Sequence, residues 1–151
     1  MKKVAISACL LGNKCRYDGS DNYDPKLLGL LECYEIIPFC PEDFCYGTPR
    51  PTMDLIDKNK EIKVISNLTS ANLTPPIKEY AKAFFESNNN IELFIGKDRS
   101  PSCGVCSSKV YNSKKELIST TGTGIMAQAA KNLKIKSYDA EEYLKIKKGF
   151  N

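Results

Sequence analysis

Short apolar runs alternate with amphipathic segments along the whole chain. The apolar runs at residues 4–8, 35–39 and 91–95 have the length and composition of buried strands. A longer segment opens on Pro75-Pro76 and repeats its apolar side chains every three or four residues, which predicts a helix. Three asparagines at 88–90 end that pattern, so the helix separates the second of these strands from the third.

Weaker patterns fill the rest of the chain. The helical segments that they predict are residues 25–31, a helix that follows Thr-Thr-Gly-Thr-Gly at 120–124, and a closing helix that Asp139 caps. The extended segments are a hairpin at 53–56 and 61–65, a second hairpin within 107–119, and a last strand at 134–138. The glycine-rich stretch at 120–124 has two interpretations, an ordinary helix start and a set of amides that bind an anion.

Strands that alternate with helices predict an α/β fold in which a mostly parallel sheet carries helices on both faces. The chain has 151 residues, the usual size of one domain, and shows no repeat, linker or low-complexity tract. We therefore expect residues 1–151 to form one three-layer, Rossmann-like domain.

Composition narrows the possible locations and partners. No apolar run approaches membrane-spanning length, and Met-Lys-Lys leads directly into the first strand without a signal-peptide pattern. We therefore expect a cytoplasmic protein with no membrane partner. The net charge of +4 comes partly from lysines between 131 and 148, and it permits an anionic partner such as tRNA without indicating one.

Cysteine is abundant and histidine is absent. An odd number of cysteines in a reducing compartment does not favour a disulfide framework, so metal or redox chemistry becomes the alternative. The absence of histidine excludes His-containing zinc sites, Cys–His pairs and Ser-His-Asp triads. Proton transfer then depends on Asp, Glu, Lys, Tyr, Cys or a hydroxyl group. The seven cysteines are Cys9, Cys15, Cys33, Cys40, Cys45, Cys103 and Cys106.

Three of the cysteines follow predicted strands. Cys9 comes directly after the first strand, Cys40 directly after the second, and Cys103 one loop after the third. Parallel strands bring their carboxyl ends to one edge of the sheet, where open α/β sheets bind ligands. The three thiols are therefore expected to converge there, either as metal ligands or as small buried hydrophobic residues.

The other four cysteines have different expected places. Cys33 follows a predicted helix and is assigned to the core, whereas Cys15 and Cys45 lie in loops near the proposed edge as auxiliary ligands. Cys106 forms a Cys-x-x-Cys with Cys103, the spacing of a thiol redox pair. The residues that follow this pair look like a strand rather than a helix, and the chain has no second Cys-x-x-Cys for a zinc ribbon.

Five short motifs occur in a fixed order over most of the chain. They are SACLLG (7–12), CRYDG (15–19), CPE (40–42), GTPRP (47–51) and RSPSCG (99–104). Together they resemble the thiouracil desulfurase family, which was long a bacterial domain family of unknown function.

The resemblance implies a [4Fe–4S] cluster that is held by Cys9, Cys40 and Cys103, with one iron free of protein ligands. It also implies that Glu42 and Ser100 are catalytic. The expected reaction is a non-redox desulfuration of a thiolated pyrimidine, in which the open iron binds the substrate sulfur and 4-thiouracil becomes uracil plus sulfide.

Several alternatives stay open at this point. Ser102 competes with Ser100, Cys45 competes with Cys40, and Cys15 or Cys45 can serve as the fourth ligand of a non-catalytic zinc or iron–sulfur module. A thiol-redox protein that uses Cys103 and Cys106 is a further alternative. Arg50 is either a loop anchor or a donor to a substrate carbonyl. The sequence does not distinguish a free base, a nucleoside and thiolated tRNA as substrate, or define the oligomer.

Overall fold

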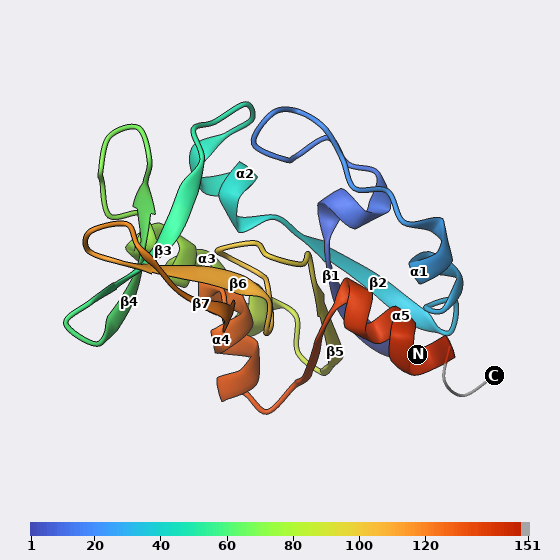
Figure 1. Ribbon diagram of the computed structural model, residues 1–151. Helices are drawn as coiled ribbons and strands as arrows, with labels where there is room; N and C mark the ends of the chain where they lie inside the picture. Colours follow the sequence, from blue (N-terminus) through green and yellow to red (C-terminus); the bar gives the residue numbers. More distant parts are fainter. Residues whose placement is uncertain (149–151) are drawn as a thin grey trace.

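The computed structural model describes residues 1–148 and contains two four-stranded sheets with helices around them (Figure 1). None of the helices in this range is both long enough and apolar enough to cross a membrane. The strands are β1 (Lys2–Ser7), β2 (Tyr34–Phe39), β3 (Met53–Lys58), β4 (Glu61–Ser66), β5 (Ile91–Gly96), β6 (Ser108–Asn112), β7 (Leu117–Gly122) and β8 (Lys136–Asp139). The helices are η1 (Ala8–Leu11, a 3-10 helix), α1 (Pro25–Gly29), α2 (Pro41–Tyr46), α3 (Thr74–Ser87), α4 (Ile125–Asn132) and α5 (Ala140–Lys148).

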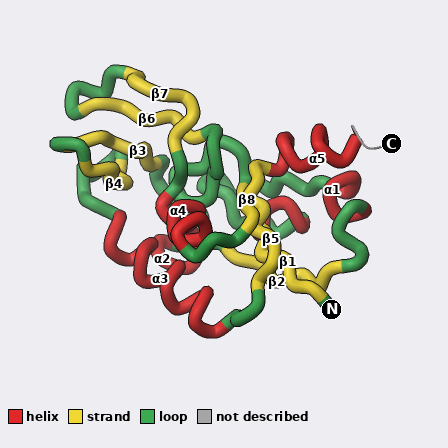
Figure 2. The backbone as a smooth tube through the Cα atoms, turned by 90° about the horizontal axis from the view of Figure 1, so that it is seen from below, coloured by secondary structure: helices red, strands yellow, loops and turns green. Residues whose placement is uncertain are grey.

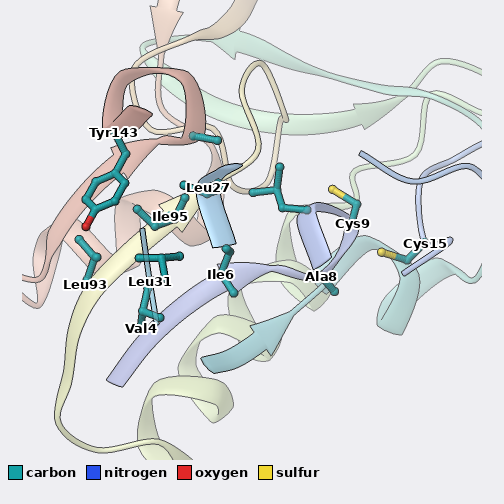
Figure 3. Packing of buried hydrophobic residues seen from close by; sticks show 12 residues of the cluster. Val4, Ile6, Ala8, Cys9, Cys15, Leu27, Leu31, Leu93, Ile95 and Tyr143 are labelled. Atoms are coloured by element: carbon teal, nitrogen blue, oxygen red, sulfur yellow. The ribbon is translucent and has the colours of Figure 1, made fainter. Parts of the chain in front are cut away.

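The first sheet has the strand order β2-β1-β5-β8, and every pair in it is parallel. Successive side chains of β1 point to opposite faces, as a buried strand requires. Val4 and Ile6 pack with Leu27 of α1 and Tyr143 of α5, whereas Ala5 packs with residues of α3 and α4. Helices therefore cover both faces, which confirms the predicted α/β fold. Figure 3 shows the cluster on the α1 and α5 face.

The second sheet has the order β4-β3-β6-β7 and contains both predicted hairpins. A parallel pairing of β3 with β6 joins them into one sheet, which the sequence pattern did not predict. Ile77 of α3 and Ile125 of α4 pack against this sheet, while Ala81 and Met126 of the same helices pack against the first. Figure 2 shows these two helices between the sheets.

Two short helices at the strand ends were not predicted. η1 has four residues and follows β1 directly, and α2 has six residues and is separated from β2 by Cys40 alone. One turn or so of helix is too short to establish an apolar period, so pattern analysis does not detect it. η1 contains Cys9 and α2 begins directly after Cys40, so the two helices fix these cysteines at the carboxyl ends of β1 and β2.

Candidate active site

A cavity of about 460 Å³ opens at the carboxyl ends of β1, β2 and β5. Cys9, Cys40 and Cys103 all line it, as their positions after the predicted strands indicated. Glu42 and Ser100 line the same cavity, so the structure brings together all five of the site residues expected from the sequence. Its wall also includes a fourth thiol, that of Cys15.

Cys9 is positioned by the turn from β1 into η1, which ends at Gly12 with a left-handed φ of 97°. The hydroxyl oxygen of Ser7 lies 3.4 Å from Cys9 Sγ and 3.9 Å from Cys103 Sγ. The two sulfurs are therefore no farther apart than the sum of these distances. Asn22 Nδ2 also donates to Cys9 Sγ, at 3.5 Å. Figure 3 shows Cys9 and Cys15 together at one end of the hydrophobic cluster.

Cys40 is the residue that precedes the first turn of α2. Pro41 occupies the first helical position, where its missing N–H costs nothing, and Glu42 follows it in the same turn. The Cys40 amide donates to Tyr80 Oη at 3.1 Å, and Cys40 Sγ lies 3.8 Å from the carbonyl oxygen of Cys15. The start of α2 thus directs a thiol and a carboxylate toward the same cavity.

Cys103 lies in a loop that is packed closely against its neighbours. A Cβ atom on Gly96 would lie 1.7 Å from the Cys103 carbonyl oxygen, and one on Gly124 would lie 2.5 Å from the carbonyl carbon of Ser102. Only glycine permits such close backbone contact. The Met126 amide, in the first turn of α4, donates to the Ser102 carbonyl at 2.7 Å. The glycine-rich stretch before α4 is therefore a helix start that holds this loop.

Asp139 secures the other end of that loop and does not cap α5 as expected. Its buried carboxylate accepts from the Val105 amide at 2.7 Å, the Cys106 amide at 2.8 Å and the Ser107 hydroxyl at 2.9 Å. The carboxylate of Asp98 takes the predicted role instead, because it accepts from the Glu141 amide at 3.1 Å. The position of Asp139 at the carboxyl end of a strand was the only sequence signal for its role.

Glu42 is the centre of a polar cluster beside the thiols. Its Oε2 accepts from Ser100 Oγ at 3.3 Å and from Ser102 Oγ at a shorter distance, and its Oε1 lies 3.5 Å from Arg50 Nε. Ser102 is fully buried, whereas Ser100 is partly exposed. Ser100 Oγ also accepts from the amides of Ser102 and Cys103, each at 3.2 Å. Both candidate serines therefore bind the same carboxylate.

The thiols of Cys15, Cys40 and Cys103 are in environments where burial disfavours the charged thiolate. Burial raises the pKa of Cys40 and of Cys103 to about 12, and it also raises the pKa of Cys15. Thiolates at these positions need a cation beside them, which a bound metal centre supplies. Across residues 1–148, no three Cys, Asp or Glu side chains are grouped tightly enough to hold a single metal ion. The three strand-end sulfurs instead surround a shared cavity, and an all-thiolate donor set is the one that iron–sulfur clusters take.

The remaining cysteines separate into those inside and those outside the cavity. Cys15 is buried in its wall, whereas Cys45 is half-buried on α2 and is not among the lining residues. Cys33 is exposed, contrary to the expected core position, because α1 ends at Gly29 and the chain turns at the surface before β2. Cys106 is also exposed and outside the cavity.

The sequence profile of the 2-thiouracil desulfurase family matches residues 4–142. The chain belongs to this family. A similar protein, YbbK of Bacillus subtilis (strain 168), which is described as uncharacterized, is 28% identical over 138 residues, which cover 85% of this chain and 89% of YbbK. The solved structure of the [4Fe-4S]-dependent thiouracil desulfidase TudS shares the fold, with a TM-score of 0.75, 24% identity and full coverage of both chains. The resemblance noted from the five motifs is thus confirmed.

Proposed function

We propose that this protein is a [4Fe–4S]-dependent desulfurase that hydrolyses thiolated uracil to uracil and sulfide. The observation that carries the proposal is the single cavity that Cys9, Cys40 and Cys103 share with Glu42 and Ser100. Membership of the 2-thiouracil desulfurase family supports the substrate class, and the name of TudS supports the cofactor.

Cys9, Cys40 and Cys103 would hold the cluster. A cubane with three protein thiolates leaves one iron open, and that iron is a Lewis acid with affinity for a substrate sulfur. The protein contributes rigid placement of the thiols. β1 and η1 hold Cys9, the start of α2 holds Cys40, and the close glycine contacts hold the loop of Cys103.

Glu42 is assigned as the general base. Both of its oxygens face donors, which are the hydroxyls of Ser100 and Ser102 and the guanidinium of Arg50, so the group is arranged to act as an acceptor. In the proposed reaction, it takes a proton from the water that attacks the ring carbon. A carbon–oxygen bond forms and the carbon–sulfur bond breaks. The sulfur leaves as hydrogen sulfide with both protons of the water, one returned by Glu42 and one lost by the new hydroxyl as it becomes the carbonyl, and no electrons are exchanged.

Ser100 is assigned to orient that water. Two backbone amides donate to its oxygen, so its own proton is directed toward Glu42 or toward a molecule in the cavity. Ser102 also donates to Glu42 but is fully buried, which suits a residue that fixes the carboxylate rather than one that contacts substrate. This assignment keeps Ser100 as the catalytic serine.

The direct test begins with protein reconstituted and purified without oxygen. We expect about four irons per chain and an equal amount of acid-labile sulfide. Adding 2-thiouracil or 4-thiouracil should then release uracil and sulfide in equal amounts without consuming a reductant. Cluster-loaded protein that releases no sulfide from either isomer would contradict the proposal.

The burial of Cys15 in the cavity wall favours one alternative, a saturated iron–sulfur binding module without catalysis. In that case Cys15 would be the fourth protein ligand and no iron would be open to a substrate. Adding thiouracil would then leave the visible spectrum of the cluster unchanged. A spectral change on addition, retained in a Cys15→Ser variant, would exclude this alternative.

A further inference from the structure

Arg50 places a buried guanidinium in the wall of the same cavity. Its side chain is only 5% exposed. Nη1 donates to the Gly47 carbonyl at 3.0 Å and to Thr48 Oγ1 at 2.8 Å, and Nη2 donates to the Cys15 carbonyl at 2.9 Å. These contacts confirm Arg50 as a loop anchor, and they fix the orientation of its planar group.

The anchoring contacts do not use all of its donors. An arginine side chain has five N–H groups, and the three hydrogen bonds leave Nε–H and one N–H of Nη2. Nε is buried and has no hydrogen-bond partner among the residues that the structure describes. Glu42 Oε1 lies 3.5 Å away, close enough for ionic attraction but without hydrogen-bond geometry. A buried donor without an acceptor is unfavourable and rare in proteins, which points to an acceptor supplied by a ligand.

We propose that Arg50 Nε–H binds the carbonyl oxygen of the substrate pyrimidine and thereby selects thiouracils over thiones that lack this oxygen. The inference rests on the proposed function, because it takes thiolated uracil as the ligand of this cavity. It adds a specificity-determining residue to the thiol ligands and the Glu42 cluster.

The positions around Arg50 suit this role. The Cys15 carbonyl lies 2.9 Å from Arg50 Nη2 and 3.8 Å from Cys40 Sγ, so Nη2 is on the side of the Cys40 thiol and Nε is on the side of Glu42. In 2-thiouracil and in 4-thiouracil, the sulfur and the oxygen flank the same ring nitrogen. A ring whose sulfur faces the thiols can therefore present its oxygen to a donor beside Glu42 in either isomer.

The chemistry predicts strong selection. A hydrogen bond from a charged donor contributes more than a neutral one, and a site built to bind a polar group rejects an analogue that lacks it because the donor stays buried and unpaired. Pyrimidine-4-thione is the matched analogue of 4-thiouracil, since it keeps the sulfur and both ring nitrogens but has no oxygen at C2.

The test compares kcat/KM for 4-thiouracil and pyrimidine-4-thione in the wild type, Arg50→Met and Arg50→Lys. We expect the ratio of the two values to fall roughly 10- to 100-fold in both variants, mainly through a loss with 4-thiouracil. Comparing ratios cancels the intrinsic reactivity of each compound. Lysine keeps the charge but lacks the planar Nε–H, so full rescue by Arg50→Lys would overturn the inference, as would an unchanged ratio in Arg50→Met.

A matched control is Lys131→Met, because Lys131 also anchors a loop, through the Val105 carbonyl and Thr123 Oγ1, but lies outside the cavity. Its selectivity ratio should stay at the wild-type value. Iron and sulfide content, measured for every variant, shows whether the cluster is retained.

A binding measurement separates failure of this inference from failure of the proposed function. Calorimetry on cluster-loaded wild type should show tighter binding of uracil than of pyrimidin-4-one, which lacks the second oxygen. Tighter uracil binding without sulfide release from thiouracil supports Arg50 as an oxygen-binding residue and contradicts the desulfurase. If the wild type releases sulfide but binds uracil and pyrimidin-4-one equally well, the proposed role of Arg50 is contradicted and the desulfurase is not. This comparison uses only the wild type, so it holds even if the variants do not fold.

Discussion

Two hollows of the protein differ in size and in chemistry. The groove between the second sheet and helices α3 and α4 has a volume of about 1100 Å³, and its wall includes Phe85, Ile118 and Leu133. The cavity at the edge of the first sheet has a volume of about 460 Å³, and its wall includes four cysteines, Glu42 and Arg50. No cysteine is among the residues that line the larger hollow, so volume alone does not locate the candidate active site.

The difference follows from how the two sheets are connected. Every strand of the first sheet is parallel, so each strand delivers its carboxyl end to the same edge. Long crossover connections return the chain to the start of each new strand, so residues that are far apart in the sequence meet at this edge. The hairpins of the second sheet are antiparallel, so successive strand ends go to opposite edges. The experiments below test whether the chemistry is confined to the edge of the first sheet.

The largest effect is expected from the three strand-end thiols. Cys9→Ser, Cys40→Ser and Cys103→Ser should each lose the cluster and, with it, all measurable sulfide release, because serine is a poor ligand for iron. Iron content, visible absorption and turnover report this result. Cys106→Ser is the control, since its thiol is exposed and outside the cavity, and it should remain fully active. A strong loss in Cys106→Ser would instead favour the thiol-redox alternative.

A large but smaller effect is expected for Glu42→Gln. Removing a general base typically lowers turnover by roughly 10²- to 10⁴-fold, and the amide should leave the iron content unchanged because it is close to the carboxylate in size. The measurement is kcat at saturating thiouracil. Asp43→Asn is the matched control, because Asp43 lies in the same turn of α2 but accepts from Thr48 Oγ1 instead. Wild-type turnover in Glu42→Gln would remove Glu42 from the mechanism.

Substitution of Ser100 is expected to lower turnover, whereas substitution of Ser102 is expected to lower stability. Ser100→Ala is expected to lower kcat by roughly 10- to 100-fold, the usual value of a hydrogen bond to a charged group. Ser102→Ala should mainly lower the melting temperature, since its fully buried hydroxyl holds Glu42 from within the structure. Measuring kcat and the melting temperature for both variants shows which serine is catalytic and which is structural. The reverse pattern would make Ser102 the catalytic serine.

The edge of the first sheet was also the region that sequence patterns predicted best. Strand periodicity and the placement of Cys9, Cys40 and Cys103 after strands are local features, so they suffice to predict that the thiols meet. The parallel contact of β3 with β6 pairs Leu55 with Val110, which lie far apart in the sequence and carry no shared local signal. The role of Asp139 was missed for the same reason, because its partners come from a distant loop.

A moderate effect on stability is expected at Asp139, which holds the loop after Cys103. Asp139→Asn should lower the free energy of unfolding by about 1.5–3 kcal/mol, because a buried acceptor of three hydrogen bonds loses its charge and receives donors of its own. Urea denaturation of the iron-free protein measures this change. Glu79→Gln on the exposed face of α3 is the control and should be close to wild type. Equal stability of the two variants would show that the loop does not depend on Asp139.

The smallest effect on turnover is expected from substitutions in the groove between the second sheet and helices α3 and α4. The residues that line this groove do not line the cavity of the candidate active site. Ile118 and Leu133 are 52% and 57% exposed, so Ile118→Lys and Leu133→Lys remove little buried area. Substitutions at such exposed positions usually change stability by no more than about 0.5 kcal/mol, and kcat/KM for thiouracil should stay within about twofold of wild type. Thr52→Lys places the same charge at an exposed position of the cavity wall and should lower kcat/KM more than either groove variant. A tenfold loss in Leu133→Lys would instead make the groove part of the substrate site, and the two hollows would have to act together.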